Sequence, residues 1–194
     1  MCVILVGSFI PEKLLRKAWD ANPDGAGFWT NGKVYKGFME YDSFMASYRK
    51  AKKGSDTVAH FRIATHGAVN PENCHPFYHG DTVLFHNGIV DGYGSKDLSD
   101  SREFFEDVVI RLDPDARLKL LDLVADATGS KFCLIQNNVL TIHGDWHAID
   151  DCFASNTFFQ HSWKIDNRWG WERDMYMEEM RQLGEIVPFE EEEV

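Results

Sequence analysis

The order of strand-like and helix-like segments limits the possible folds of this chain more than any other sequence feature. Two helical segments, from Ser99 or Asp100 to Leu112 and from Pro114 to about Gly129, separate two groups of strand-like segments. The strand-like segments are residues 2–8, 28–30, 33–35, 57–64, 82–86, 131–136, 139–143 and about 150–154. Because strands and helices do not alternate regularly, the sequence predicts a layered α+β domain rather than a parallel βαβ sheet.

Turn and cap residues refine this outline. Asn31-Gly32 is a strong hairpin signal between two strand-like segments, and Asn137-Asn138 is expected to form a second turn. Asp42 is expected to cap a helix. The remaining predicted elements are helices at 11–19, 42–53 and 173–183 and a loop rich in Gly, Pro and Asn at 66–81.

Composition excludes several classes of protein. The 194 residues are 44% hydrophobic, which is enough to bury a core, and they contain no linker-like segment. We therefore expect one domain over residues 1–188, followed by an acidic tail at 189–194. With 20 Lys and Arg against 31 Asp and Glu, the net charge of −11 argues against nucleic acid or an anionic membrane surface as the main partner.

The expected location is the cytoplasm. No segment approaches the roughly 20 consecutive apolar residues that a membrane span needs. The apolar residues after Met1 have neither the basic flank nor the cleavage site of a signal peptide. The four cysteines form no C-x-x-C pair, so we expect reduced thiols.

Cys2 can be a nucleophile because it directly follows Met1. Removal of Met1 would give Cys2 a free α-amine, whose ordinary pKa of roughly 7.7–8.0 allows it to accept the thiol proton near neutral pH. Nucleophile and base then belong to one residue, as in N-terminal-nucleophile enzymes. The alternative is that Cys2 is a small buried hydrophobe at the start of an apolar strand.

Other residues suit the chemistry of an amide substrate. Arg62, near a strand end, offers a planar group that can bind a carboxylate through two hydrogen bonds. Asn87 and Gly88 can present a side-chain amide and a backbone N–H to a developing oxyanion. The alternatives are a solvent-facing arginine and an ordinary hairpin turn. Clustered Cys and His residues lack the spacing of a structural zinc site, so no metal is expected.

Taken together, Cys2 and five ordered segments resemble the class II glutamine amidotransferase family. Two of the segments fit H-x-R-x-A-T-x-G and N-x-H-P-F, and a third is H-N-G. The segments are Asn22 to Phe28, His60 to Gly67, Asn73 to Phe77, His86 to Gly88 and Ser99 to Ser101, with a looser match at Phe153 to Asn156.

The resemblance implies a fold and a set of roles. The fold would be that of the N-terminal-nucleophile (Ntn) hydrolases, a four-layer αββα sandwich with two antiparallel sheets. The enzyme would hydrolyse the side-chain amide of L-glutamine to glutamate and ammonia through a Cys2 thioester, without a cofactor. The implied roles are nucleophile and base for Cys2, oxyanion hole for Asn87 and Gly88, carboxylate binding for Arg62, ammonium binding for Asp100, and pocket wall for Thr65 and His66.

The use of the ammonia stays open. Better-known members of the family carry a second domain that consumes it, and the residues beyond about 160 are too few for such a domain. The chain could be a free-standing glutaminase, the ammonia-supplying subunit of a separate synthase, or a hydrolase of a related γ-glutamyl amide. A non-catalytic binding protein that retains Met1 is the alternative from another class.

Overall fold

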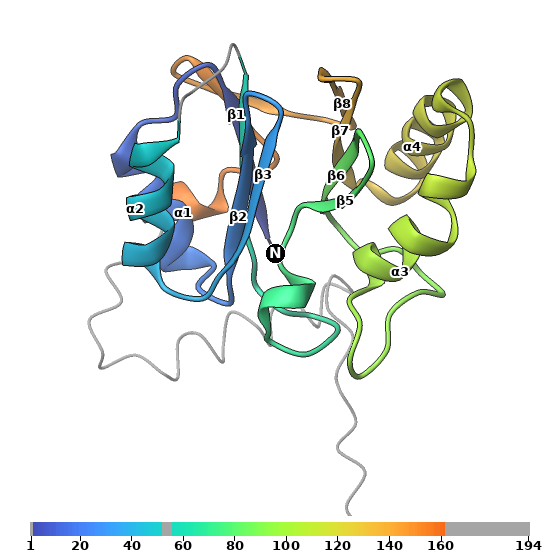
Figure 1. The fold of residues 1–194 in the computed structure, drawn as a ribbon, viewed down its shortest axis with the longest axis horizontal. Coiled ribbons are helices and arrows are strands. Elements are labelled where there is room, and N and C mark those ends of the chain that lie inside the picture. Colours follow the sequence, from blue (N-terminus) through green and yellow to red (C-terminus); the bar gives the residue numbers. More distant parts are fainter. Residues whose placement is uncertain (1, 52–55, 162–194) are drawn as a thin grey trace, which may run out of the picture. The chain divides into compact units, whose positions relative to one another are not determined.

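Ten strands and four α-helices form the fold in a computed structural model that describes residues 2–51 and 56–161 (Figure 1). The strands are β1 (Val3–Gly7), β2 (Ala26–Thr30), β3 (Lys33–Phe38), β4 (Thr57–Phe61), β5 (Phe77–His79), β6 (Thr82–Asn87), β7 (Lys131–Gln136), β8 (Val139–His143), β9 (His147–Ile149) and β10 (Cys152–Ala154). The helices are α1 (Glu12–Ala21), α2 (Tyr41–Lys50), α3 (Asp100–Asp107) and α4 (Pro114–Thr128), with short 3₁₀ helices η1 (Pro71–Asn73), η2 (Val109–Arg111) and η3 (Phe158–His161).

The strands pair into two antiparallel sheets. The first has the order β3-β2-β4-β1-β10-β9, and the second has the order β5-β6-β7-β8. In the first sheet Val3 of β1 lies opposite Phe61 of β4, and in the second Asn87 of β6 lies opposite Lys131 of β7. The start of β1 therefore lies beside the end of β4.

Three apolar interfaces stack these elements in layers. Helices α1 and α2 pack on the outer face of the first sheet, around Leu15 and Phe44. Helices α3 and α4 pack on the outer face of the second sheet, around Phe105 and Leu121. The inner faces of the two sheets meet through a third cluster, which we call the inter-sheet layer. Its buried members are Ile4, Val6, Trp29, Val58, Val83, Phe85, Cys133 and Ile135. The predicted α+β sandwich with two antiparallel sheets is confirmed, and Figure 1 shows its order of helix, sheet, sheet and helix.

Local sequence signals explain several elements. Asn31 and Gly32 both have positive φ, at 50° and 73°, as the tight turn between β2 and β3 requires. Asp113 caps α4 by accepting hydrogen bonds from the backbone N–H groups of Asp115 and Ala116. Gly129 ends α4 in the left-handed conformation that glycine adopts without strain.

The structure corrects four sequence predictions. The predicted loop at 66–81 contains η1 and β5, and β9 was not predicted. Asp42 lies inside the first turn of α2, because the helix begins one residue earlier and Glu40 occupies the capping position. The helix predicted to reach Leu112 ends at Asp107 and continues as η2. The predicted helix at 173–183, the domain limit at residue 188 and the tail at 189–194 lie outside the described residues.

Within residues 2–51 and 56–161, no helix combines the length and the apolar character that crossing a membrane would take.

Candidate active site

Strand alternation relates three of the predicted site residues, Cys2, Arg62 and Asn87, to one layer of the fold. Side chains two apart on a strand share a face. Ile4 and Val6 on β1, Val58 on β4, and Val83 and Phe85 on β6 all point into the inter-sheet layer. Cys2 continues this alternation just before β1, as Asn87 does on β6 and Arg62 does just beyond β4. The site thus occupies the end of the inter-sheet layer, where apolar side chains give way to polar ones.

Cys2 is half-buried just before β1. Its Sγ donates a hydrogen bond to the Ile63 carbonyl at 3.4 Å, and its own carbonyl accepts one from Asn156 Nδ2 at 2.7 Å. Burial raises the pKa of the Cys2 thiol, Arg62 opposes that rise and Asp100 adds to it. The thiol thus lies next to the residue that follows Arg62, and the roles of Arg62 and Asp100 toward it stay a prediction. A thiol with a raised pKa needs a nearby base to become a nucleophile at neutral pH.

Arg62 is buried, with 3% of its surface exposed, so the solvent-facing alternative is wrong. Its Nη1 donates to the Ala68 carbonyl at 3.0 Å, and its Nη2 donates to the carbonyls of His66 at 2.8 Å and Gly67 at 3.3 Å. The guanidinium therefore holds the loop after β4 in place. A guanidinium has more N–H groups than these bonds use, so part of it can still bind a ligand.

The loop held by Arg62 contains two predicted pocket residues. Thr65 and His66 are both half-buried. Gly67, with φ of 72°, packs so closely on the segment before α3 that an added Cβ would lie 2.5 Å from the Ser99 backbone nitrogen. This contact requires glycine and fixes the loop against the second sheet's helices. Thr65 and His66 follow Arg62 closely in the chain and lie in the loop that Arg62 holds. Their role as a pocket wall stays a prediction.

Asn87 is the last residue of β6 and is 4% exposed. Its Nδ2 donates to Ser155 Oγ at 2.9 Å, while its Oδ1 is buried without a hydrogen-bond partner in the described part of the chain. Gly88 has φ of 153°, and a Cβ there would overlap Ser130 Oγ at 2.2 Å. The hairpin alternative is wrong, because α3 and α4 follow β6 before the chain returns to the sheet as β7.

Asp100 is the first residue of α3 and is 5% exposed. Its Oδ2 accepts a hydrogen bond from the Val90 backbone N–H at 2.9 Å, and its Oδ1 accepts one from Ser101 Oγ at 3.3 Å. Ser101 Oγ in turn lies 2.8 Å from His86 Nδ1. Because the Ser101 hydroxyl donates to Asp100, His86 Nδ1 carries the proton in this chain of hydrogen bonds.

Three buried histidines next to the site were not assigned a role from the sequence. The rings of His60 and His75 lie 4.0 Å apart, and His60 Nε2 donates to the His86 carbonyl at 3.2 Å. Burial lowers the pKa of His60 to about 3, that of His86 to about 4, and that of His75 well below its ordinary value. All three are therefore neutral near pH 7. These histidines could have been found from the sequence, because each lies in one of the three histidine-containing segments of the class II resemblance.

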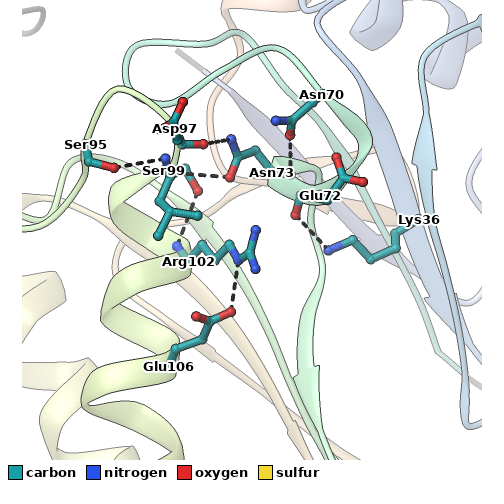
Figure 2. A network of polar contacts seen from close by, with 10 residues as sticks. Lys36, Asn70, Glu72, Asn73, Ser95, Asp97, Ser99, Arg102 and Glu106 are labelled. Atoms are coloured by element: carbon teal, nitrogen blue, oxygen red, sulfur yellow. Dashed lines mark hydrogen bonds and ion pairs between the residues drawn. The ribbon is translucent and has the colours of Figure 1, made fainter.

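Asn73 was also missed as a supporting residue. Its Nδ2 donates to the carbonyls of Ala68 and Asp97 at 3.0 and 2.7 Å, and its Oδ1 accepts from the Ser99 N–H at 3.2 Å. Figure 2 shows this side chain between η1 and the segment that leads into α3. Asn73 thereby ties the Arg62 loop to the helix that carries Asp100. The sequence did point to Asn73, because it is the first residue of the N-x-H-P-F segment.

A separate cavity of about 550 Å³ lies at the outer side of η1, lined among others by Lys36, Phe77 and Arg102. Figure 2 shows Lys36 and Arg102 extending toward each other. Cys2 and Asp100 do not line this cavity, so it is distinct from the site described above. Within the described ranges, no three His, Cys, Asp or Glu side chains are grouped so that they could hold a metal ion.

Comparison with known proteins adds to this geometry. The chain is 30% identical over 98 residues to the glutamine–fructose-6-phosphate aminotransferase (isomerizing) of Aliivibrio fischeri, and 27% identical over 92 residues to that of Helicobacter pylori. These matches cover 50% and 46% of this chain. A shorter match, 46% identical over 43 residues and 22% of this chain, is to the enzyme of Buchnera aphidicola. The chain resembles the class II glutamine amidotransferases.

The extent of the class II resemblance is limited. The matches cover 16%, 15% and 7% of the lengths of the three relatives, in the order Aliivibrio, Helicobacter and Buchnera. No family model matches the chain. The resemblance therefore concerns a glutamine amidotransferase-type domain, and the relatives' whole activities are not carried over with it.

Proposed function

We propose that this chain is a glutaminase of the class II, Ntn-type fold that hydrolyses the side-chain amide of L-glutamine to glutamate and ammonia. The observation that carries the proposal is a chain of contacts: the Cys2 thiol bonds the carbonyl of Ile63, next to Arg62, and Asn73 ties the loop held by Arg62 to the residue before Asp100. The two ends of an amino acid carry opposite charges, and a guanidinium and a carboxylate beside one nucleophile match those two ends. An acidic protein can bind such a zwitterion, because the matching charges are local.

In the proposed reaction, removal of Met1 first exposes the Cys2 α-amine. The amine takes the thiol proton, and the Cys2 sulfur attacks the amide carbon to form a C–S bond and a tetrahedral oxyanion. Asn87 and the Gly88 N–H stabilise that oxyanion. The C–N bond then breaks, and the ammonium of Cys2 returns its proton so that ammonia leaves. Water, deprotonated by the same amine, hydrolyses the thioester and releases glutamate.

Arg62 and Asp100 would bind the two charged ends of the substrate. The N–H groups of Arg62 that do not bind the carbonyls of residues 66–68 would hold the α-carboxylate. Asp100 would hold the α-ammonium, with its carboxylate oriented by the Val90 N–H and by Ser101. Thr65 and His66 would form the wall next to Arg62. Each of these residues lies in a segment that also carries the class II resemblance.

The fate of the ammonia forms a further part of the proposal. The relatives are named as enzymes that act on glutamine together with fructose 6-phosphate, and the matches cover only a small part of their length. We propose that a separate cytoplasmic synthase accepts the ammonia from this chain. A rise in glutamine hydrolysis when a co-purifying enzyme and its acceptor substrate are added would support this part of the proposal. An unchanged rate would contradict it.

The decisive experiment measures glutamate release from glutamine by protein whose intact mass shows that Met1 is absent. Cys2→Ala should abolish release, and Cys133→Ala provides the matched control, because Cys133 is a buried thiol in the inter-sheet layer. We expect Cys133→Ala to keep the wild-type rate per folded molecule. Release by Cys2→Ala at the wild-type rate would overturn the proposal. Wild-type cleavage of other γ-glutamyl amides but not of glutamine would transfer the same chemistry to those substrates.

A further inference from the structure

Ser155 links the strand of the nucleophile to the proposed oxyanion residue. It is fully buried just after β10, and its Oγ accepts a hydrogen bond from the Ile4 backbone N–H at 2.8 Å. Its own backbone N–H donates to the Ile4 carbonyl at 2.9 Å. The same Oγ lies 2.9 Å from Asn87 Nδ2. One hydroxyl therefore contacts β1 two residues from Cys2 and, on the other side, the end of β6.

The hydrogen bonds of this pair are incomplete with the amide in that orientation. Ser155 Oγ receives two N–H groups, from Ile4 and Asn87, and these are its hydrogen bonds within the described residues. Its own proton then has no acceptor there. Meanwhile Asn87 Oδ1, an obligate acceptor, is buried without a donor from the described residues. A buried acceptor and a buried donor left unpaired are both costly.

A half-turn of the Asn87 amide pairs the Ser155 proton with Asn87 Oδ1 and moves the unpaired position from an acceptor to a donor. Amide oxygen and nitrogen have nearly the same shape, so the hydrogen-bond network decides between the two orientations. After the half-turn, the Ser155 hydroxyl donates to Asn87 Oδ1 and still accepts from the Ile4 N–H. Asn87 Nδ2 then takes the buried position that lacked a partner. Both N–H groups of Nδ2 are then unpaired at the end of the inter-sheet layer, a cost that an oxyanion accepting from them removes.

We propose that Ser155 is a positioning residue that fixes the Asn87 amide with its Nδ2 directed to the oxyanion of the reaction. This proposal rests on the proposed glutaminase function. Asn156 supports the same arrangement, because its Nδ2 holds the Cys2 carbonyl and its Oδ1 accepts from the Phe158 N–H at 3.2 Å. Two successive residues thus hold the nucleophile and the oxyanion donor, which come from different sheets.

The kinetic test is a double-mutant cycle on glutamine hydrolysis. Ser155→Ala should lower kcat roughly 10-fold to 100-fold with little change in KM, because the amide loses its orientation but the substrate contacts remain. In the Asn87→Ala background, Ser155→Ala should have almost no further effect on kcat. Ser155→Thr, which keeps a hydroxyl, should recover most of the lost rate. An equal loss of kcat in both backgrounds would show that Ser155 acts through general stability and would overturn the proposal.

Alkylation of Cys2 by iodoacetamide provides the second readout, since this reaction forms no oxyanion. Ser155→Ala should leave its rate within about twofold of wild type. A drop in alkylation as large as the drop in kcat would place the effect on Cys2 and overturn the role assigned to Asn87. If Ser155→Ala does not fold, the wild type and Ser155→Thr still decide by neutron diffraction.

Neutron diffraction separates this proposal from the proposed function, because deuterium marks the amide nitrogen directly. We expect the ND₂ group of Asn87 on the side away from Ser155 and the Ser155 deuterium directed at Asn87 Oδ1. An ND₂ group directed at Ser155 would overturn the positioning proposal even if glutamine is hydrolysed. Failure to hydrolyse glutamine, with the expected deuterium positions, would instead count against the proposed function alone.

Discussion

The inter-sheet layer has two regions built on the same strands and on the same faces. In the first region, β1, β4 and β6 contribute side chains such as Ile4, Val58 and Phe85, which are buried and apolar. In the second region, the next positions on the same faces are Cys2 and Asn87. Here a buried polar atom, Asn87 Oδ1, has no hydrogen-bond partner among the described residues. Apolar burial stabilises the first region, whereas the second gives up part of that stability for groups that can contact a ligand.

The buried histidines sharpen this difference. Among the described residues, ring nitrogens of His60, His75 and His86 are buried without hydrogen-bond partners. Each such atom costs free energy in the folded state, unlike the close-packed atoms of the apolar region. Mutations in the two regions should therefore separate stability from activity.

The largest effect should come from the apolar region. Phe85→Ala removes a fully buried ring and should lower the free energy of unfolding by about 3–5 kcal/mol. Urea denaturation measures this loss. The activity of the remaining folded molecules should stay near wild type, and a small change in stability would contradict the prediction.

Asn87→Ala in the polar region should have the opposite profile. Loss of an oxyanion donor should reduce kcat by roughly 10²–10³, with KM almost unchanged. The melting temperature should fall only slightly, because one end of the Asn87 amide has no hydrogen-bond partner among the described residues. Steady-state kinetics and thermal melts on the same sample give both numbers. A large drop in melting temperature with intact kcat would return Asn87 to a purely structural role.

Acid should weaken the polar region selectively. The folded state lowers the pKa of His60 to about 3, below its ordinary value of 6.5, so the unfolded chain binds more protons as the pH falls. The stability contribution is thus fully present above about pH 6.5 and declines as the pH falls toward 3. Between about pH 7 and pH 5 the loss should be roughly 2 kcal/mol for this histidine. Denaturation at both pH values should show a smaller loss for His60→Gln, and equal losses would contradict the prediction.

The smallest effects should come from substrate recognition. Arg62→Lys replaces a planar group by a point charge and should raise KM for glutamine by roughly 10-fold. Asp100→Asn should act in the same direction, because the α-ammonium loses its charged partner. Glutamine titrations of both variants measure the effect, with each rate referred to the folded fraction that a thermal melt gives, because both residues also make buried hydrogen bonds. Normal KM values in both would mean that the substrate is not held by its two charged ends.

The sequence predicted the parts of the fold that depend on local signals. The turn at Asn31-Gly32 follows from conformations that only a few residue types adopt easily. The helix from Pro114 was predicted from the proline, and the structure adds the cap at Asp113. Short edge strands such as β5 and β9 were missed, because three residues carry too little periodic pattern to be distinguished from a loop.

The candidate site was predictable only in its composition. Cys2, Arg62, Asn87 and Asp100 could be named from motifs, but their supports depend on contacts between distant parts of the chain. Ser155 contacts Asn87 across 68 positions of sequence. Arg62 holds three loop carbonyls, and no residue near it in the sequence predicts this. A buried arginine can bind either a ligand or the backbone. Such contacts follow from how the layers pack, which no short motif contains.

The pairing of β1 with β4 sets a limit on changes in length. Val3 lies opposite Phe61, and this register places Cys2 next to Arg62. If a single residue is removed from Val3–Gly7 and the strand after the deletion keeps its register, Cys2 turns from the inter-sheet layer toward the helices. Insertions at the Asn137-Asn138 turn, by contrast, would leave this pairing untouched. Variants of β1 should therefore tolerate a change of composition more easily than a change of length between Cys2 and the paired residues.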